Sequence, residues 1–277
     1  MARTVKDIVD MKKNGKKISV LTSYDYALAS LCDKAGVDIL LVGDSAGMVV
    51  LGYDDTLQVT MEQMEIFVGA VSRAKQNALV VGDLPFMSYQ ASITDAIANS
   101  GRLIKAGADC VKLEGGAPMA DTVNAIVETG IPVMGHIGFQ PQTTMLSEGY
   151  KVQGRTAESA KRLIEDAKAL EQAGVFSIVF EMVSNEVAKI ITETVSVPTI
   201  GIGSGVHCDG QVLVVHDILG LYEKLKPKFV KQYLSLSNDI VKAVSSYKKD
   251  VEDSKFPAEK NWFSMEKGEY EKLKKEI

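Results

Sequence analysis

The chain has 277 residues, of which 46% are hydrophobic and 24% are charged. This composition is typical of a globular protein and excludes disorder for most of the chain, while the length allows one large domain or two small ones. The 31 basic and 36 acidic residues give a net charge of −5, which argues against general binding to a nucleic-acid backbone.

Nothing in the sequence indicates a membrane protein or a disulfide-rich secreted protein. No apolar run reaches the ~18 residues that a membrane span requires, and the start, MARTVKDIVD, lacks the apolar core of a signal peptide. Cys32, Cys110 and Cys208 form no CxxC pair that would indicate a zinc site or a disulfide framework. We therefore expect a cytoplasmic protein with reduced thiols, no membrane contact and no nucleic-acid partner.

Short apolar runs rich in Val and Ile alternate along the chain with helical patterns. Continuous apolar runs are typical of parallel strands that are covered on both faces. The predicted strands are Ile18–Ser23, Asp38–Gly43, Ala78–Asp83, Cys110–Glu114, Val133–His136, Ser177–Glu181, Thr199–Gly203 and Val212–Val215. The predicted helices between them are Ala27–Ala35, Met61–Lys75, Thr94–Ala106, Ala120–Glu128, Ala157–Ala173 and Glu186–Thr194. Repeated βα units over roughly 250 residues favour an α/β protein with a (β/α)8 TIM barrel.

The end of this pattern is irregular. Only residues 204–211 separate the last two predicted strands, which is too short for a crossover helix. Either that helix is absent or the eighth strand is misplaced. Lys228–Val251 repeats apolar residues at helical spacing, so we expect one face of it to pack on the barrel. We expect residues 1–254 to form a single barrel domain with an N-terminal helix and C-terminal helices. Residues 255–277 are expected to form a polar tail, either solvated or docked on a neighbouring subunit.

Polar side chains follow the ends of several predicted strands, and most of them are acidic. In a parallel barrel the carboxyl ends of the strands carry the chemistry, so these side chains are expected to meet at one mouth. They are Asp44, Ser45, Asp83, Lys112, Glu114, His136 and Glu181. Four carboxylates and one lysine at close range favour a bound cation, and ligands that are all oxygen favour Mg²⁺.

Spacing alone leaves the individual roles open. Lys112 and Glu114 are two residues apart and so face the same side of a strand. They either hold an anionic substrate beside the metal or form an internal salt bridge. Glu181 is either a partly buried general base or a solvated carboxylate at a strand end. His136, as a lone histidine, is interpreted as a core residue or a neighbour of the site rather than as the base.

Six segments resemble the ketopantoate hydroxymethyltransferase family, in order along the chain. They are GDSAGMVVLGYDDTLQVT, DLPFMSYQ, VKLEGG, GHIGFQPQ, GYKVQGR and GIGSGVHCDGQVLVVHDILG. The resemblance implies a (β/α)8 barrel of the phosphoenolpyruvate mutase and isocitrate lyase group. It also implies a transferase that moves a hydroxymethyl group from 5,10-methylenetetrahydrofolate to 3-methyl-2-oxobutanoate through a Mg²⁺-stabilised enolate. The products are ketopantoate and tetrahydrofolate, in the first step of pantothenate and coenzyme A biosynthesis.

The same resemblance implies a set of site residues. Asp44 and Asp83 match metal ligands, and Glu114 matches an acid near the metal, acting directly or through water. Asp44, Ser45, Asp83 and Lys112 match residues that contact the keto acid. His136 matches a residue near the substrate, and Glu181 matches the proton acceptor. The partners are then a small 2-oxo acid and a folate, and the assembly is a homodecamer of two pentameric rings. This chain has Met87 where the family it resembles has a glycine, and Gln58 where that family has a proline. Met87 is expected to narrow the mouth of the site.

The sequence is also compared with what other classes of protein would require. A lyase or mutase of the same barrel group, acting on another 2-oxo acid or a phosphoenolpyruvate-like substrate, is the main alternative. The chain lacks the KKCGH-type cysteine motif of such lyases, and Cys110 instead lies inside a predicted strand. A barrel that only binds a metabolite, or a structural scaffold, would not require acids at successive strand ends.

Overall fold

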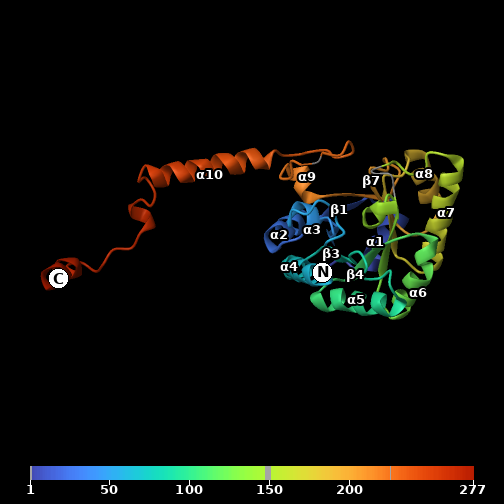
Figure 1. The fold of residues 1–277 in the computed structure, drawn as a ribbon, viewed down its shortest axis with the longest axis horizontal. Coiled ribbons are helices and arrows are strands. Elements are labelled where there is room, and N and C mark those ends of the chain that lie inside the picture. Colours follow the sequence, from blue (N-terminus) through green and yellow to red (C-terminus); the bar gives the residue numbers. More distant parts are fainter. Residues whose placement is uncertain (1, 147–150, 225) are drawn as a thin grey trace.

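The computed structural model describes residues 2–146, 151–224 and 226–277, so Gly149 and Tyr150 of the GYKVQGR segment lie outside the described residues. Within them, parallel strands β1 to β8 close into a barrel in sequence order, and β8 pairs with β1 (Figure 1). The strands are β1 (Ile18–Thr22), β2 (Ile39–Val42), β3 (Leu79–Asp83), β4 (Cys110–Glu114), β5 (Val133–Gly138), β6 (Ser177–Glu181), β7 (Thr199–Ile202) and β8 (Gly210–Leu213). The predicted (β/α)8 barrel is thereby confirmed.

Helices surround this barrel and close one of its ends. They are α1 (Val5–Lys13), α2 (Tyr26–Lys34), α3 (Ala46–Val49), α4 (Met61–Ala74), α5 (Ile93–Ala106), α6 (Ala120–Glu128), α7 (Ala157–Gln172), α8 (Asn185–Thr194), α9 (Val215–Leu219), α10 (Leu236–Glu252) and α11 (Glu269–Glu276). Short 3-10 turns span Ala117–Met119, Pro141–Leu146 and Glu259–Asn261. Among the residues that the structure describes, every helix is too short or too polar to span a bilayer.

Two apolar layers hold the barrel together. One lies between the strands and the outer helices, and it includes Val80 of β3 and Leu103 of α5. The other fills the barrel interior, where inward-facing residues such as Val81 and Val179 meet Ile8 of α1. Because α1 inserts apolar side chains at the amino ends of the strands, that end is closed, and a site can open only at the carboxyl ends. All three cysteines are buried free thiols, as expected.

The irregularity near the end of the barrel has a definite form. No helix lies between β7 and β8 in the described chain, and β8 begins at Gly210 rather than at Val212, while Val215 begins α9. Side-chain hydrogen bonds hold the loop that takes the place of the absent helix. The Ser204 hydroxyl donates to the Phe180 carbonyl at 2.8 Å, and Asp209 accepts from the Thr199 backbone N–H at 2.9 Å. These bonds fix the loop between β7 and β8 to backbone groups of β6 and β7.

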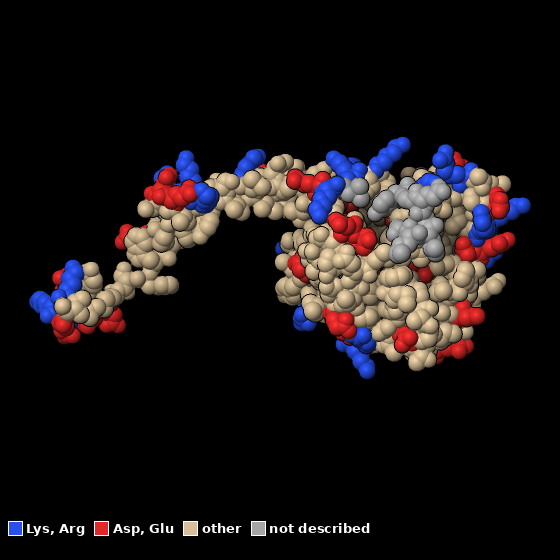
Figure 2. Space-filling view, viewed as in Figure 1, with Lys and Arg blue, Asp and Glu red and all other residues tan. Residues whose placement is uncertain are grey.

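The C-terminal segment differs from the expectation that it packs on the barrel. Helix α10 begins at Leu236 rather than near Lys228, and none of its residues is buried. Figure 1 shows it projecting away from the barrel, and Figure 2 shows the following residues standing clear of the main body. We call residues 236–277 the arm. Its apolar side chains contact nothing that could bury them within a single chain, which is why the predicted packing is wrong.

Met87 occupies a backbone conformation that favours glycine. Its φ is +64°, its side chain is 55% exposed, and it lines neither of the two cavities beside Glu181, so it does not narrow the mouth of the site. The left-handed conformation costs a non-glycine residue about 1–2 kcal/mol. Glycine also gains entropy in the unfolded chain, which lowers the benefit of the replacement by about 0.5–1 kcal/mol.

We therefore predict that Met87→Gly raises the free energy of unfolding by about 0.5–1 kcal/mol, measured by urea denaturation at fixed protein concentration. Met265→Gly is the matched control, because Met265 is 52% exposed and is not among the residues with positive φ. The control is expected to be neutral or destabilising. A destabilised Met87→Gly variant would contradict the strain assigned to this position.

Candidate active site

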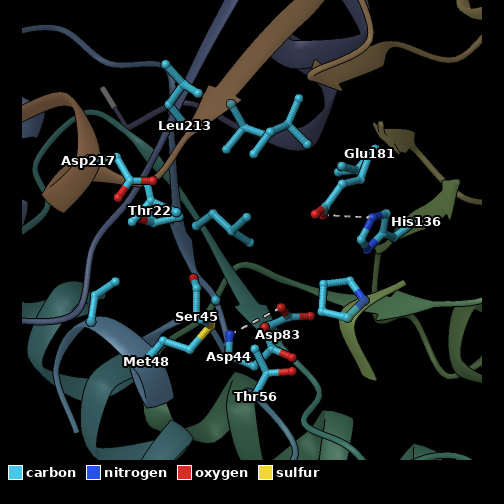
Figure 3. A pocket seen from close by; sticks show the side chains of 18 of the residues that line it. Thr22, Asp44, Ser45, Met48, Thr56, Asp83, His136, Glu181, Leu213 and Asp217 are labelled. Carbon is cyan, nitrogen blue, oxygen red and sulfur yellow. Dashed lines mark hydrogen bonds and ion pairs between the residues drawn. The ribbon is translucent and has the colours of Figure 1, made fainter. Parts of the chain in front are cut away.

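Strand register brings the predicted polar side chains together inside the barrel. Asp83 of β3 lies beside Lys112 of β4, and Glu114 of β4 lies beside His136 of β5. Lys112 and Glu114 are both buried, because alternate residues of β4 face the barrel interior. A cavity of about 310 Å³ opens above this layer at the carboxyl ends of the strands, and Glu181 lines it as well (Figure 3).

The innermost part of the site is an ion pair between Lys112 and Asp83. The Lys112 ammonium donates to both carboxylate oxygens of Asp83, at 2.7 and 2.8 Å, and both side chains are at most 5% exposed. Burial disfavours the charged ammonium, but Asp83, Glu114 and Asp44 outweigh burial and raise the pKa of Lys112. Lys112 therefore remains a fixed positive charge at neutral pH.

Asp44 lies next to this pair and is held by an amide. Its backbone N–H donates to Asp83 Oδ2 at 3.4 Å, and its Oδ2 accepts from Gln142 Nε2 at 3.0 Å. Burial, together with the negative charges of Asp83 and Glu114, raises the pKa of Asp44 to about 8, although Lys112 and Gln142 act in the opposite direction. Burial likewise raises the pKa of Asp83. The site thus holds more carboxylates than its own cation can balance.

Gln142 and Tyr89 fix the position of these carboxylates. The Gln142 backbone N–H donates to Glu114 Oε2 at 3.0 Å, and its side-chain Nε2 also donates to the Leu84 carbonyl at 2.9 Å. The Tyr89 hydroxyl donates to Gln142 Oε1 at 2.9 Å, which leaves the amide one orientation. Gln142 is 1% exposed and Tyr89 is 2% exposed, so the carboxylates are held by a rigid shell.

His136 bridges two acids on the opposite side of the cavity. Its Nδ1 lies 3.4 Å from Glu114 Oε1, and its Nε2 lies 3.4 Å from Glu181 Oε2. Burial and the Lys112 ammonium disfavour the protonated imidazole, but the two carboxylates outweigh them and raise the pKa of His136 to about 9. His136 is therefore an imidazolium at neutral pH and forms an ion pair with each of the two acids.

The backbone at the end of β6 directs Glu181 into the cavity. Met182, the next residue, has a φ of +49°, and its N–H donates to the Ile202 carbonyl at 2.9 Å. Gly138 of β5 pairs with Glu181 and has a φ of +100°, and a side chain there would collide with the Glu181 carbonyl. The chain therefore turns sharply just after the carboxylate. Strained backbone of this kind is concentrated at functional sites.

The donor set at the inner end fits a small hard cation. Glu114 Oε1 is buried without a hydrogen-bond donor, and Asp44, which has no ion-pair partner of its own among the described residues, lies beside Asp83. Mg²⁺ typically takes one or two protein carboxylates and keeps several waters. Within the described ranges, no three His, Cys, Asp or Glu side chains are grouped as direct ligands of one ion. Asp44 and Asp83 therefore supply the number of carboxylates that such an ion typically takes from a protein.

Every residue predicted for the site lines this one cavity, from strands and loops that are far apart in the sequence. They are Asp44, Ser45, Asp83, Lys112, Glu114, His136 and Glu181. The sequence prediction missed Gln142 and Tyr89. Both lie within segments that carry the family resemblance, but each is on a loop rather than at a strand end, and no periodicity marks them. It also left out Asp217 and Thr22, which line the same cavity.

Comparison with known proteins identifies the family. A sequence model of the family described as ketopantoate hydroxymethyltransferase matches residues 2–259. A protein of Nitrosopumilus maritimus named 3-methyl-2-oxobutanoate hydroxymethyltransferase is 71% identical over 100% of this chain and 99% of its own length. A Clostridium botulinum protein of the same name is 53% identical over 99% of this chain and 100% of its own length.

Solved structures share the fold at much lower identity. Phosphoenolpyruvate phosphomutase from Streptomyces platensis matches with a TM-score of 0.62 and 13% identity, over 99% of this chain and 96% of that one. A 2,3-dimethylmalate lyase of the phosphoenolpyruvate mutase and isocitrate lyase superfamily matches with a TM-score of 0.56 and 15% identity, over 100% and 98%. These proteins thus share the fold of this chain, and the sequence relatives are far more similar than the structural ones. The chain therefore belongs to the ketopantoate hydroxymethyltransferase family.

Proposed function

We propose that this chain transfers a hydroxymethyl group to 3-methyl-2-oxobutanoate, with 5,10-methylenetetrahydrofolate as the one-carbon donor. The observation that carries this proposal is full-length identity of 71% and 53% to proteins named for that reaction. A new carbon–carbon bond joins C3 of the keto acid to the methylene carbon, and water supplies the hydroxyl oxygen. The products are 2-dehydropantoate and tetrahydrofolate, which places the enzyme at the first step of pantothenate biosynthesis.

The inner end of the cavity is suited to the keto-acid head. Lys112 supplies a buried positive charge for the substrate carboxylate, and the Ser45 hydroxyl, which shares a hydrogen bond of 2.8 Å with Tyr24, lies on the cavity wall. Asp44 and Asp83 are the residues that would hold Mg²⁺, with Glu114 reaching it through water. When bound, that ion supplies Lewis-acid stabilisation of the negative charge that develops on the keto acid.

Glu181 is the group we assign to proton removal from C3. Its side chain is 17% exposed and lies across the cavity from Asp83, so it faces a substrate bound at the inner end (Figure 3). The His136 imidazolium lies 3.4 Å from Glu181 Oε2 and so holds this carboxylate in place at the cavity wall. His136 also shields Glu181 from the negative charge of Glu114.

The alternative within the same barrel group, a lyase or mutase, is less well supported. The structural relatives with those names are 13–15% identical to this chain, and identity at that level supports a shared fold but not a shared reaction. The proteins named as hydroxymethyltransferases are 53–71% identical over the full length.

We also propose that the protein is a homo-oligomer, and a decamer as the family resemblance implies. Four of the apolar residues of α10 that are exposed in the single chain recur at helical spacing and share one face: Ile240, Val244, Tyr247 and Val251. Exposed apolar surface of this kind is typical of protein–protein interfaces. The arm is therefore the segment we expect to be buried between subunits.

Glu181→Gln is predicted to slow exchange of the C3 proton of 3-methyl-2-oxobutanoate with solvent by about 100-fold or more, because a positioned base contributes roughly 10²–10⁴-fold. The exchange is followed by NMR in D₂O with Mg²⁺ and without folate. Binding of the keto acid is expected to change little. Glu193→Gln, on the exposed side of α8, is the matched control. Exchange at the wild-type rate in Glu181→Gln would remove Glu181 as the base.

Asp83→Asn is predicted to weaken Mg²⁺ binding by roughly tenfold or more, since even residues beyond the direct ligands contribute about 10–100-fold. Asparagine keeps an acceptor for Lys112, so the variant should remain folded. Asp109→Asn is the control, because Asp109 pairs with Lys75 and precedes β4 at the opposite end of the barrel. Wild-type affinity of Asp83→Asn in calorimetric titration would exclude Asp83 as a ligand.

Val244→Asp is predicted to reduce the assembly to smaller species, measured by light scattering, because it places a charge in the middle of the apolar face of α10. Lys242→Glu, on the opposite face of the same helix, should leave the mass unchanged. A variant lacking residues 236–277 should behave like Val244→Asp. An unchanged mass in both Val244→Asp and the truncated variant would show that the arm is not an interface.

A further inference from the structure

Asp217 is a carboxylate in the main cavity to which the mechanism above gives no role. It lies on α9 and is half-buried. Figure 3 shows it beside Thr22, across the cavity from Glu181 and His136. Within the described part of the chain, no hydrogen-bond donor and no basic side chain pairs with its carboxylate. Two acceptor oxygens thus face the cavity without a partner among the described residues.

The chemistry of an unpaired carboxylate sets the kind of ligand it can bind. Burial raises the pKa of Asp217 to about 6, so the group is still mostly ionised at neutral pH. An ionised carboxylate accepts two parallel N–H donors particularly well. The aminopyrimidine ring of a reduced folate presents such a pair, its ring N–H and its exocyclic amine, on one edge.

The surrounding walls suit a flat heterocycle. Met48, Leu213 and Tyr222 line the same cavity and provide apolar contact surface. The cavity, at about 310 Å³, lies in the range of about 300–1,000 Å³ that encloses drug-sized ligands. The keto acid is far smaller and is drawn to the charged inner end by Lys112. The part of the cavity near Asp217 is therefore left for a second ligand.

A neighbouring cavity gives a longer ligand room to continue. It has a volume of about 990 Å³ and shares Glu181, Pro227 and Phe229 with the main cavity. Lys17 and Lys228 line it, which matches the carboxylates at the far end of a folate. A donor anchored at Asp217 can thus extend past Phe229 into this second space.

We propose that Asp217 binds the aminopyrimidine ring of the folate donor through paired hydrogen bonds and so directs the donor's methylene carbon at the keto acid. This inference rests on the proposed function and deepens it, because it assigns a binding residue to the second substrate. Asp217 is then a specificity-determining residue that selects folates by the hydrogen-bond pattern of their ring.

The test uses the full-length protein and tetrahydrofolate as the probe, with binding measured by calorimetry under anaerobic conditions. Asp217→Asn replaces one acceptor by an NH₂ donor and should weaken binding of tetrahydrofolate by about 10- to 100-fold, the size expected for charge-assisted hydrogen bonds. Affinity for 3-methyl-2-oxobutanoate and exchange of its C3 proton should not change. Asp54→Asn is the matched control, since Asp54 is an exposed carboxylate that also borders the cavity.

A second experiment changes the ligand rather than the protein. A 2-desamino analogue of tetrahydrofolate lacks one of the two donors, so the wild type should bind it about 10- to 100-fold more weakly than tetrahydrofolate. Asp217→Asn should discriminate far less between the two ligands. Equal binding of both ligands by the wild type, or wild-type affinity of Asp217→Asn for tetrahydrofolate, would overturn the assignment. A wild type that neither exchanges the C3 proton nor binds tetrahydrofolate would instead overturn the proposed function.

Discussion

The structure depends on one buried interaction, the contact between the Lys112 ammonium and both oxygens of Asp83. Buried ions are stable only when they are paired and their remaining lone pairs are satisfied. Lys112 satisfies Asp83, and the His136 imidazolium lies 3.4 Å from Glu114, but Asp44 is buried beside Asp83 without a cation of its own among the described residues. The inner end of the barrel thus favours an added cation beside Asp44 and Asp83, and the metal proposed above follows from that arrangement.

The surrounding shell explains why this costly arrangement holds its shape. Tyr89 and Gln142 come from two different loops, and their hydrogen bonds connect Asp44, Glu114 and the Leu84 carbonyl. Because Gln142 bonds both Asp44 and Glu114 and is itself fixed by Tyr89, these carboxylates are held close to one another. The strand register contributes in the same way, since it sets Glu114 beside His136 and Gly138 beside Glu181.

Most of the barrel and the acids of the site could be predicted from the sequence, because both depend on local patterns. β4 and β6 have the predicted bounds, since their apolar runs are cut sharply by acidic residues. The position of β8 was wrong by two residues, because the loop before it is held by side-chain bonds of Ser204 and Asp209 that leave no periodic signal. Gln142 and Tyr89 were missed for a related reason: their roles arise from contacts between loops. The packing of α10 was wrong because its amphipathic pattern shows that it needs a partner but not which surface that partner provides.

The place where the arm leaves the barrel has a consequence for how assembly and substrate binding relate. Pro227 and Phe229, which separate the two cavities, lie only a few residues before the arm begins at Leu236. Whatever anchors the arm on another molecule also restrains the short stretch that forms this shared wall. In the proposed oligomer, an isolated subunit and an assembled one would then differ in the shape of the entrance, and dissociation on dilution would lower turnover per subunit even though every reacting group stays in place.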